Sequence, residues 1–543
     1  MKRHIRQIRN AVTVVFRNPD LRRQAIALFF FNGAEWAVWI AMIVYAYDQG
    51  GATMAGFVAF IQLVPAALFA PFASVLPDRY RPALVLTLSY VAQGIAMGAT
   101  AFVLIFGGPP WLAYTAAAVA ATAIVVTRPT VATLVPALAR VPEELTAANV
   151  VSGWIESISV LMAPAVAGLL IAAWGPGWVF LLMGALVLVG AILVLPIRGP
   201  EAAPDATIGK VAELLEGFQV LREEPQARLL VGLLGSQWVA IGMLDVLYVV
   251  LAIGTLGMGQ GGAGFLNAAF GAGGVLGIAF TASLVGRARL MPAVMVSLGV
   301  WAVAFGVMAV ASQTLGALLL LAVAGASRSL FDVAGRTLLQ RTAPAHVLAR
   351  VFGVLEALIM AGTAVGALIA PVLVNVGGAT AATIGVGIML PLLALLGGRR
   401  LLGLDASANV PVVEIGLLRS LRLFAALPPP EIEGLARSLE PLPATAGQAI
   451  VVQGEKGDRY YAIADGEFEV VVDGRRIATL GRGDGFGEIA LLHDGVRTAT
   501  VSALTPGRLY SLEKGKFLEV LTGHHPAAHV TATAIVAERL ATH

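Results

Sequence analysis

Cysteine is absent from this chain, and charged side chains are scarce. With no cysteine among 543 residues, disulfide bonds and thiolate metal sites are excluded. Only 13% of the residues are Asp, Glu, Lys or Arg, against about 25% in soluble domains. Apolar residues are abundant instead, at 58% of the chain. This balance indicates a protein that lies largely in a lipid bilayer.

The N-terminus is basic but does not have the pattern of a signal peptide. Charges at Arg17, Asp20, Arg22 and Arg23 precede the first long apolar segment. The apolar core of a signal peptide would exclude them. We therefore expect a cytoplasmic lead-in helix and no cleaved signal.

Long apolar segments follow one another through the first 403 residues. A spanning helix needs about 20 mostly apolar residues. On that criterion we predict an all-α membrane domain over 1–403, with twelve spanning helices at 25–47, 53–76, 82–106, 111–136, 147–173, 177–197, 228–253, 262–286, 291–312, 315–338, 350–375 and 379–398.

Lys and Arg occur in every second loop between these segments. The loops without either residue are 48–52, 106–110, 174–177, 254–261 and 376–378. The opposite loops carry Arg79, Arg81, Arg140, Lys210, Arg222, Arg287, Arg289, Arg341, Arg399 and Arg400. Because cytoplasmic loops are enriched in Lys and Arg, we expect both termini in the cytoplasm, in a bacterial-type inner membrane.

The spans form two halves with related sequences, at about 10–197 and 226–400, joined by a predicted cytoplasmic linker at 198–227. Residues 33–36, Gly-Ala-Glu-Trp, resemble residues 235–238, Gly-Ser-Gln-Trp. Two six-helix repeats are typical of transporters that bind their substrate between the halves.

Charged side chains inside the spans are costly and are therefore candidates for function. Arg128 and Glu156 are 28 residues apart, and so are Arg328 and Glu356. This shared spacing predicts one Arg–Glu pair in each half. Such a pair is either a structural ion pair or a gate that breaks during transport.

Two further acids, Glu35 and Asp245, have no evident basic partner in the sequence. A buried acid of this kind can take up and release a proton. We therefore expect Glu35 and Asp245 to contribute to proton coupling or substrate binding. The alternative for Glu35 is a permanently protonated acid that only forms a hydrogen bond.

The composition changes after residue 403. Residues 404–414 are a short polar linker, and 415–543 have the charges and the Gly and Asp turns of a soluble module. Helices are predicted at 431–439, 517–521 and 527–540. Strands are predicted at 449–453, 459–464, 467–472, 476–480, 498–503 and 508–512. We expect a β-barrel-like (jelly-roll) domain with flanking helices.

One stretch of this module, residues 486–500, is suited to binding a phosphorylated sugar. Gly487 lets the backbone approach a ligand closely. Residues 488–492 can form a helical turn whose free N–H groups face an anion. Arg497 offers a planar fork for two phosphate oxygens, and Glu488 can accept a hydrogen bond from a ribose hydroxyl.

These residues resemble the phosphate-binding cassette of the cyclic nucleotide-binding domain family. The match runs through Phe-Gly-Glu-Ile-Ala-Leu-Leu at 486–492 and Arg-Thr-Ala at 497–499. The resemblance implies that Arg497 pairs with the cyclic phosphate and Glu488 with the ribose, while the backbone of Gly487, Ile489 and Ala490 lines the pocket.

Two positions of the cassette affect affinity and ligand choice. Val496 stands where the family usually has proline, which loosens the turn before the arginine. A hydroxyl at Thr498 can bind the amino group of guanine, yet bacterial cyclic AMP receptors also carry Ser or Thr there. We expect cyclic AMP as the regulatory ligand, with cyclic GMP as the alternative and no cofactor.

The membrane part resembles the major facilitator superfamily, particularly its drug-efflux branch. The signature loop is Asp78-Arg79-Tyr80-Arg81, with Ser74 in place of the family glycine. The resemblance implies that Asp78, with Arg79 and Arg81, helps to lock one conformation of a secondary transporter.

We therefore expect proton-coupled efflux of small amphipathic compounds, regulated by a cyclic nucleotide through movement of the 527–540 helix. The expected partners are the lipid bilayer, a small-molecule substrate and the nucleotide. No nucleic-acid partner, metal site or enzymatic activity is expected. Three alternatives stay open: a non-transporting receptor, a transporter of the nucleotide itself, and a degenerate soluble module. The sequence does not give the oligomeric state.

Overall fold

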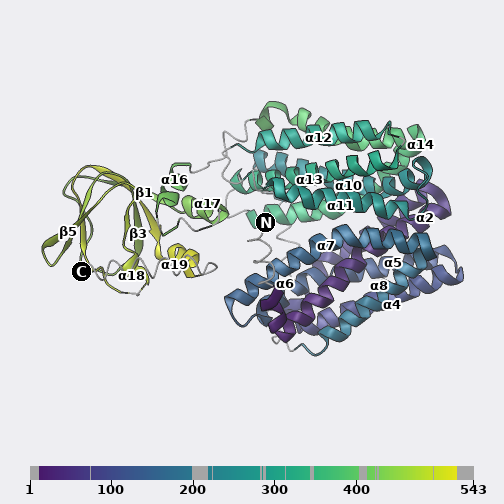
Figure 1. Cartoon of the computed structure of the whole chain (residues 1–543), viewed down its shortest axis with the longest axis horizontal. Helices are drawn as coiled ribbons and strands as arrows, with labels where there is room; N and C mark the ends of the chain where they lie inside the picture. Colours follow the sequence, from purple (N-terminus) through teal and green to yellow (C-terminus); the bar gives the residue numbers. More distant parts are fainter. Residues whose placement is uncertain are drawn as a thin grey trace. The chain divides into compact units, whose positions relative to one another are not determined.

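The computed structural model describes residues 12–522 apart from 74, 198–217, 220, 223, 282–283, 285–288, 312, 343–347, 403–411, 422, 425–426, 428 and 493–494. The chain forms two compact units, Met1–Ala408 and Asn409–His543. Figure 1 shows a bundle of helices in the first unit and a strand-rich second unit. Most of the predicted linker 198–227 and the predicted helix 527–540 lie outside the described residues.

The first group of helices, purple to blue in Figure 1, begins mostly at prolines. Proline suits the first turn of a helix because the N–H that it lacks would have no partner there. The group comprises α2 (Pro19–Ala73), α3 (Leu76–Arg79), α4 (Pro82–Phe106), α5 (Pro110–Ile124), α6 (Thr127–Leu138), α7 (Pro142–Trp174) and α8 (Pro176–Val194).

The second group, teal to green, lies together in the same unit. It comprises α10 (Pro225–Val249), the π-helix η1 (Val250–Thr255), α11 (Gly262–Thr281), α12 (Met291–Met308), α13 (Thr314–Thr342) and α14 (Leu348–Leu402). The apolar faces of both groups pack into one extensive core that contains many alanines.

Within the described residues, nine helices are long and apolar enough to cross a membrane, and Gly262–Ile278 is a shorter apolar helix. Two of the nine, Pro19–Ala70 with 52 residues and Arg350–Gly397 with 48, are about twice the length that one crossing needs. The first contains a break at Gly50 and Gly51, whose backbone is not helical. The first unit is thus a bundle of many apolar helices, while the count of twelve spans and the two repeats stay predictions.

The two groups of helices touch closely where small residues face each other. Helix α7 meets the start of α11 at Gly168, where an added Cβ would lie 2.6 Å from the carbonyl oxygen of Gly261. No side chain fits into such a gap. Glycine is therefore required for the observed approach of the two backbones.

Two hydrogen bonds join the two groups of helices at or next to predicted loops. Gln260 Nε2 donates to Asp48 Oδ2 at 2.6 Å, and Asn375 Nδ2 donates to Thr53 Oγ1 at 3.2 Å. These residues lie in or next to loops 48–52, 254–261 and 376–378, which contain neither Lys nor Arg. The bundle is thus closed at the end that carries these loops.

The soluble unit contains two antiparallel four-stranded sheets with an apolar core between them, as the jelly-roll prediction requires. One sheet has the order β1-β8-β3-β6 and the other β2-β7-β4-β5. Their bounds are β1 (Glu440–Ala444), β2 (Ala449–Val451), β3 (Arg459–Asp465), β4 (Phe468–Val472), β5 (Arg475–Leu480), β6 (Gly485–Phe486), β7 (Thr500–Ala503) and β8 (Gly507–Glu513).

In the part of this unit that the structure describes, four helices accompany the sheets: α16 (Val412–Ser420), α17 (Pro429–Arg437), α18 (Glu488–Leu492) and α19 (Lys514–Thr522). Two strands and α16 were not predicted. Strand β1 contains Pro441 and Pro443, which count against a strand, but it lies at the edge of its sheet and pairs only with β8. Proline is tolerated at such an edge because its missing N–H is not needed.

Candidate functional site

A cavity of about 260 Å³ lies in the soluble unit beside α18. One wall is apolar and comes from β2, β4, β5 and β7. The opposite wall carries the predicted phosphate-binding stretch. All six residues predicted to bind the nucleotide line this cavity: Gly487, Glu488, Ile489, Ala490, Arg497 and Thr498.

The guanidinium of Arg497 is buried and is held mainly by neutral backbone groups. Its Nη2 donates to the carbonyl oxygen of Arg459 at 2.8 Å, and its Nη1 to that of Gly487 at 3.2 Å. The ring of Tyr461 lies 5.7 Å from the guanidinium carbon. The carboxylate of Asp458, 3.5 Å away, is 76% exposed, so water screens its charge. The arginine is oriented, and most of its charge remains available.

Gly487 makes this arrangement possible. Its φ of 101° is in the region that favours glycine. An added Cβ would lie 2.6 Å from Arg497 Nη1 and 2.9 Å from the carbonyl oxygen of Arg459. The glycine thus lets the chain turn from β6 into α18 directly against the arginine.

The remaining residues of the cavity differ in exposure. Glu488 is buried, and Thr498 is exposed at the cavity wall. Burial raises the pKa of the Tyr461 phenol, which keeps the ring beside Arg497 neutral. Val496 is 57% exposed and forms an isolated bridge with Lys456. The cavity combines one buried cation with a largely apolar wall, and that is a suitable site for a small amphipathic anion.

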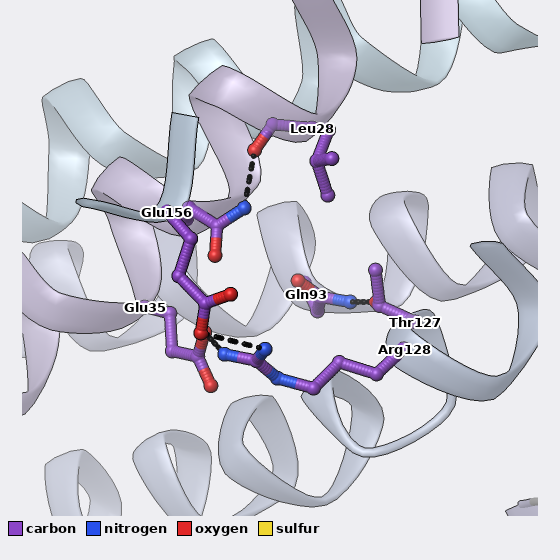
Figure 2. Close-up of polar contacts among 7 residues, drawn as sticks. Leu28, Glu35, Gln93, Thr127, Arg128 and Glu156 are labelled. Carbon is purple, nitrogen blue, oxygen red and sulfur yellow. Dashed lines mark hydrogen bonds and ion pairs between the residues drawn. The ribbon is translucent and has the colours of Figure 1, made fainter. Parts of the chain in front are cut away.

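A second cluster of charges lies in the membrane unit, where Arg128 contacts two acids (Figure 2). Its Nη2 lies 3.0 Å from Glu35 Oε2, and its Nη1 lies 3.3 Å from Glu156 Oε1. The Arg128–Glu156 contact agrees with the predicted pair. The expectation that Glu35 has no basic partner is wrong, because the guanidinium fork reaches acids on both α2 and α7.

The corresponding pair in the second half does not form. Glu356 lies 3.8 Å from Arg336, whereas Arg328 lies with its guanidinium carbon 4.9 Å from the ring centre of Trp238. The predicted Arg328–Glu356 pair is therefore wrong. Arg336 was missed, although its spacing of four residues from Asp332, which it binds at 2.9 Å, is typical of a helical ion pair.

Other predicted residues have less specific surroundings. Asp245 Oδ2 accepts a hydrogen bond from Trp39 Nε1 at 3.0 Å, which joins α10 to α2. In the signature loop, Arg79 and Arg81 are exposed, while the side chain of Asp78 lies outside the described residues, as does Ser74.

A buried polar cluster beside the charged one was not predicted. Gln93 Nε2 donates to Ser89 Oγ at 2.8 Å and to Thr127 Oγ1 at 3.1 Å. Thr127 precedes Arg128 at the start of α6. The contacts therefore fix the helix end from which the arginine projects.

Comparison with known families finds a match within each unit. Residues 442–524 match the cyclic nucleotide-binding domain, and residues 25–289 match the Major Facilitator Superfamily. The chain carries a major facilitator domain and, after it, a cyclic nucleotide-binding domain. Neither is a family of enzymes, and both agree with the predicted families.

Known relatives match the cyclic nucleotide-binding domain. A cAMP-dependent protein kinase regulatory subunit from Schizosaccharomyces pombe is 38% identical over 106 residues, which cover 19% of this chain and 26% of that protein. A cGMP-dependent protein kinase from Eimeria tenella is 34% identical over 111 residues, which cover 20% of this chain and 11% of that protein. The chain thus spans about a quarter or less of the length of these relatives.

A solved structure of the regulatory domain of Toxoplasma gondii PKA with cAMP is 26% identical to this chain. It has a TM-score of 0.20 and covers 20% of this chain and 44% of that chain.

Proposed function

We propose that this protein is a secondary transporter of twelve spanning helices whose transport cycle is regulated by a cyclic nucleotide bound at Arg497. The observation that carries the proposal is the oriented, largely unneutralised guanidinium of Arg497 in a cavity with an apolar wall, on the same chain as a major facilitator domain. The nucleotide changes transport because it binds one state of the protein better than the other.

In the soluble unit, the cyclic phosphate binds the free N–H groups of Arg497, and the ribose hydroxyl binds Glu488. The base and the sugar ring lie against the apolar wall. We take cyclic AMP as the first ligand because the relative with 38% identity is named for cAMP dependence. Titration of the full chain with cyclic AMP and cyclic GMP separates the two.

In the membrane unit, we assign proton coupling to the cluster of Glu35, Arg128 and Glu156. The side chains of Arg128 and Glu156 are about half exposed, at 51% and 52%. This exposure offers protons a route to the cluster, and a protonated Glu35 would no longer form its ion pair with Arg128. A guanidinium shared by two acids can keep one ion pair while the other breaks.

The closure of the bundle at the loops without Lys and Arg favours an inward-open state. Those loops face away from the cytoplasm under the positive-inside rule. The exposed charges around Arg128 and Glu356 then open toward the cytoplasm, where an efflux substrate enters. We place the protein among the drug-efflux-like transporters on this basis and on the signature loop at 78–81.

The test uses the full chain reconstituted in liposomes. Cyclic AMP added on the side of the soluble unit should change the rate of proton-driven flux of a fluorescent amphipathic probe. The Arg497→Ala variant should keep the basal rate and lose the change. Nucleotide binding without any flux would instead indicate a receptor, and flux of labelled cyclic AMP would indicate that the nucleotide is cargo.

A further inference from the structure

Arg128 and Arg328 occupy positions that the predicted repeat makes equivalent, but their partners differ. Arg128 lies within 3.3 Å of two carboxylates. Around Arg328, no carboxylate oxygen of the described residues forms an ion pair within 4.0 Å, and its guanidinium carbon lies 4.9 Å from the ring centre of Trp238. Arg128 thus contacts carboxylates directly, whereas Asp332 and Asp245 act on Arg328 from beyond 4.0 Å.

Two acids, one on the helix of Arg328 and one on the helix of Trp238, already have other partners. Asp332, one turn after Arg328 on α13, accepts hydrogen bonds from Arg336 Nε at 2.9 Å and from Gln237 Nε2 at 3.3 Å. Asp245, two turns after Trp238 on α10, accepts one from Trp39. Both acids attract Arg328 electrostatically, but neither of them forms a hydrogen bond with its Nε.

Two buried hydrogen-bond donors of this site have no partner among the described residues. They are Arg328 Nε and the indole Nε1 of Trp238. A buried donor without a partner costs about 1–3 kcal/mol, and more when it is charged. Such groups in a folded protein call for an explanation, and an absent ligand is one.

The immediate surroundings of Arg328 are partly apolar. A narrow crevice contains Arg328 together with Gln237, Ser297, Leu298, Trp301, Ser327, Phe331 and Leu390. The crevice is too narrow for a water molecule in this conformation, so a ligand reaches Arg328 only when these side chains move apart, and it then meets one cation and several large apolar side chains. This combination favours an anionic group attached to an apolar body.

We propose that Arg328 and Trp238 bind the carboxylate of an amphipathic monoanionic substrate. This inference rests on the proposed transport function and names its substrate class. A guanidinium binds the two oxygens of a planar carboxylate well, and the indole N–H supplies one more donor.

The first test compares two matched substitutions, Arg328→Gln and Arg128→Gln, in the full chain without added substrate. Arg128→Gln leaves two carboxylates without their cation and should lower the midpoint of thermal unfolding. Arg328→Gln removes a charge that has no ion-pair partner, so the midpoint should stay or rise. An equal drop in both variants would make Arg328 a structural residue and overturn the proposal.

The second test measures ligand binding with 2-naphthoate, its cationic analogue 2-naphthylmethylammonium, and chloride. Calorimetry on the full chain in nanodiscs should show binding of naphthoate only. In Arg328→Gln the affinity should fall by about tenfold or more, the effect of losing a hydrogen bond between charged groups. Arg328→Lys should retain part of it.

Three outcomes contradict the inference: no naphthoate binding, equal binding of the cationic analogue, or chloride binding that displaces naphthoate at equal concentration. The last would indicate a site for an inorganic anion. Cyclic AMP binding, measured in the same preparation, reports on the regulatory site separately. A failure at Arg328 therefore does not imply a failure at Arg497.

Discussion

Arg497 in the soluble unit and Arg128 in the membrane unit each contact two oxygen atoms through Nη1 and Nη2, but the groups that carry these oxygens differ in charge. Arg497 donates to two neutral carbonyl oxygens. Arg128 lies between two carboxylates. Backbone carbonyls orient a guanidinium and leave its charge for an incoming anion. Carboxylates neutralise it and make the site sensitive to their protonation.

This difference explains why we assign ligand binding to Arg497 and proton coupling to Arg128. Arg328 adds a third case to this comparison. An aromatic ring, not a carboxylate, orients that arginine in the membrane unit and leaves its charge in place. The role assigned to each arginine therefore depends on its partners. Substitutions that change those partners test the assignments, as follows.

The largest effect is expected at Arg497. Arg497→Ala should weaken cyclic AMP binding to the full chain by about 30-fold or more, because truncating one partner of a buried charge pair costs about 2–5 kcal/mol. Isothermal titration measures this loss. Arg508→Ala, on the exposed surface of β8, is the control and should bind normally. Unchanged affinity in Arg497→Ala would remove the arginine from the site.

Next in size is the effect of Glu35→Gln. The wild-type bundle should change its distribution of states when the pH is lowered, because protonation of Glu35 breaks its contact with Arg128. Glutamine mimics the protonated acid, so the variant should lose that response. Spin-label distances between the halves measure it, with Asp20→Asn as a surface control. A normal pH response in Glu35→Gln would place proton coupling elsewhere.

Gly487→Ala should have an intermediate effect. The added methyl group meets Arg497 Nη1, and residues other than glycine are strained by about 1–3 kcal/mol at such a backbone angle. We expect about a tenfold loss of nucleotide affinity in the same titration. Gly481→Ala, where an added Cβ would meet nothing within 4 Å, should bind normally. Equal affinity of both variants would show that the turn does not set the position of the arginine.

Val496→Pro should have the smallest effect. The hydrogen bonds of this bridge are made by neighbours: Gly457 N donates to Gly495 O at 3.4 Å, and Arg497 N to Glu455 O at 2.7 Å. Proline at a compatible position stabilises the folded protein by about 0.4–1 kcal/mol, so the midpoint of thermal unfolding should rise slightly and nucleotide affinity should stay or rise slightly. A loss of affinity would mean that the turn needs the valine backbone.

The nucleotide pocket could be predicted from the sequence because its polar residues are local. Residues 487–498 supply all six predicted contacts to one cavity wall. The burial of Arg497 and its carbonyl partners follow from the chain turn at Gly487. The contribution of Arg459 could not be predicted, because it acts through its carbonyl oxygen and so leaves no signal in the residue type.

The charge pairs of the membrane unit were predicted less well. The spacing of 28 residues is the same in both halves, but spacing along the chain does not fix how each helix is rotated and tilted. Arg128 therefore also contacts Glu35, which is 93 residues away in the sequence. Glu356 contacts Arg336 instead, and Arg328 lies against the ring of Trp238.

The central claim is that nucleotide binding at Arg497 shifts the states of the transporter, and one measurement tests it without knowledge of the substrate. Because the chain has no cysteine, Arg140→Cys and Arg289→Cys introduce one spin label in each half of the membrane unit. Double electron–electron resonance on the reconstituted full chain should show a changed distance distribution with cyclic AMP, and no change in an added Arg497→Ala variant. An unchanged distribution at saturating, calorimetrically verified cyclic AMP would contradict the account.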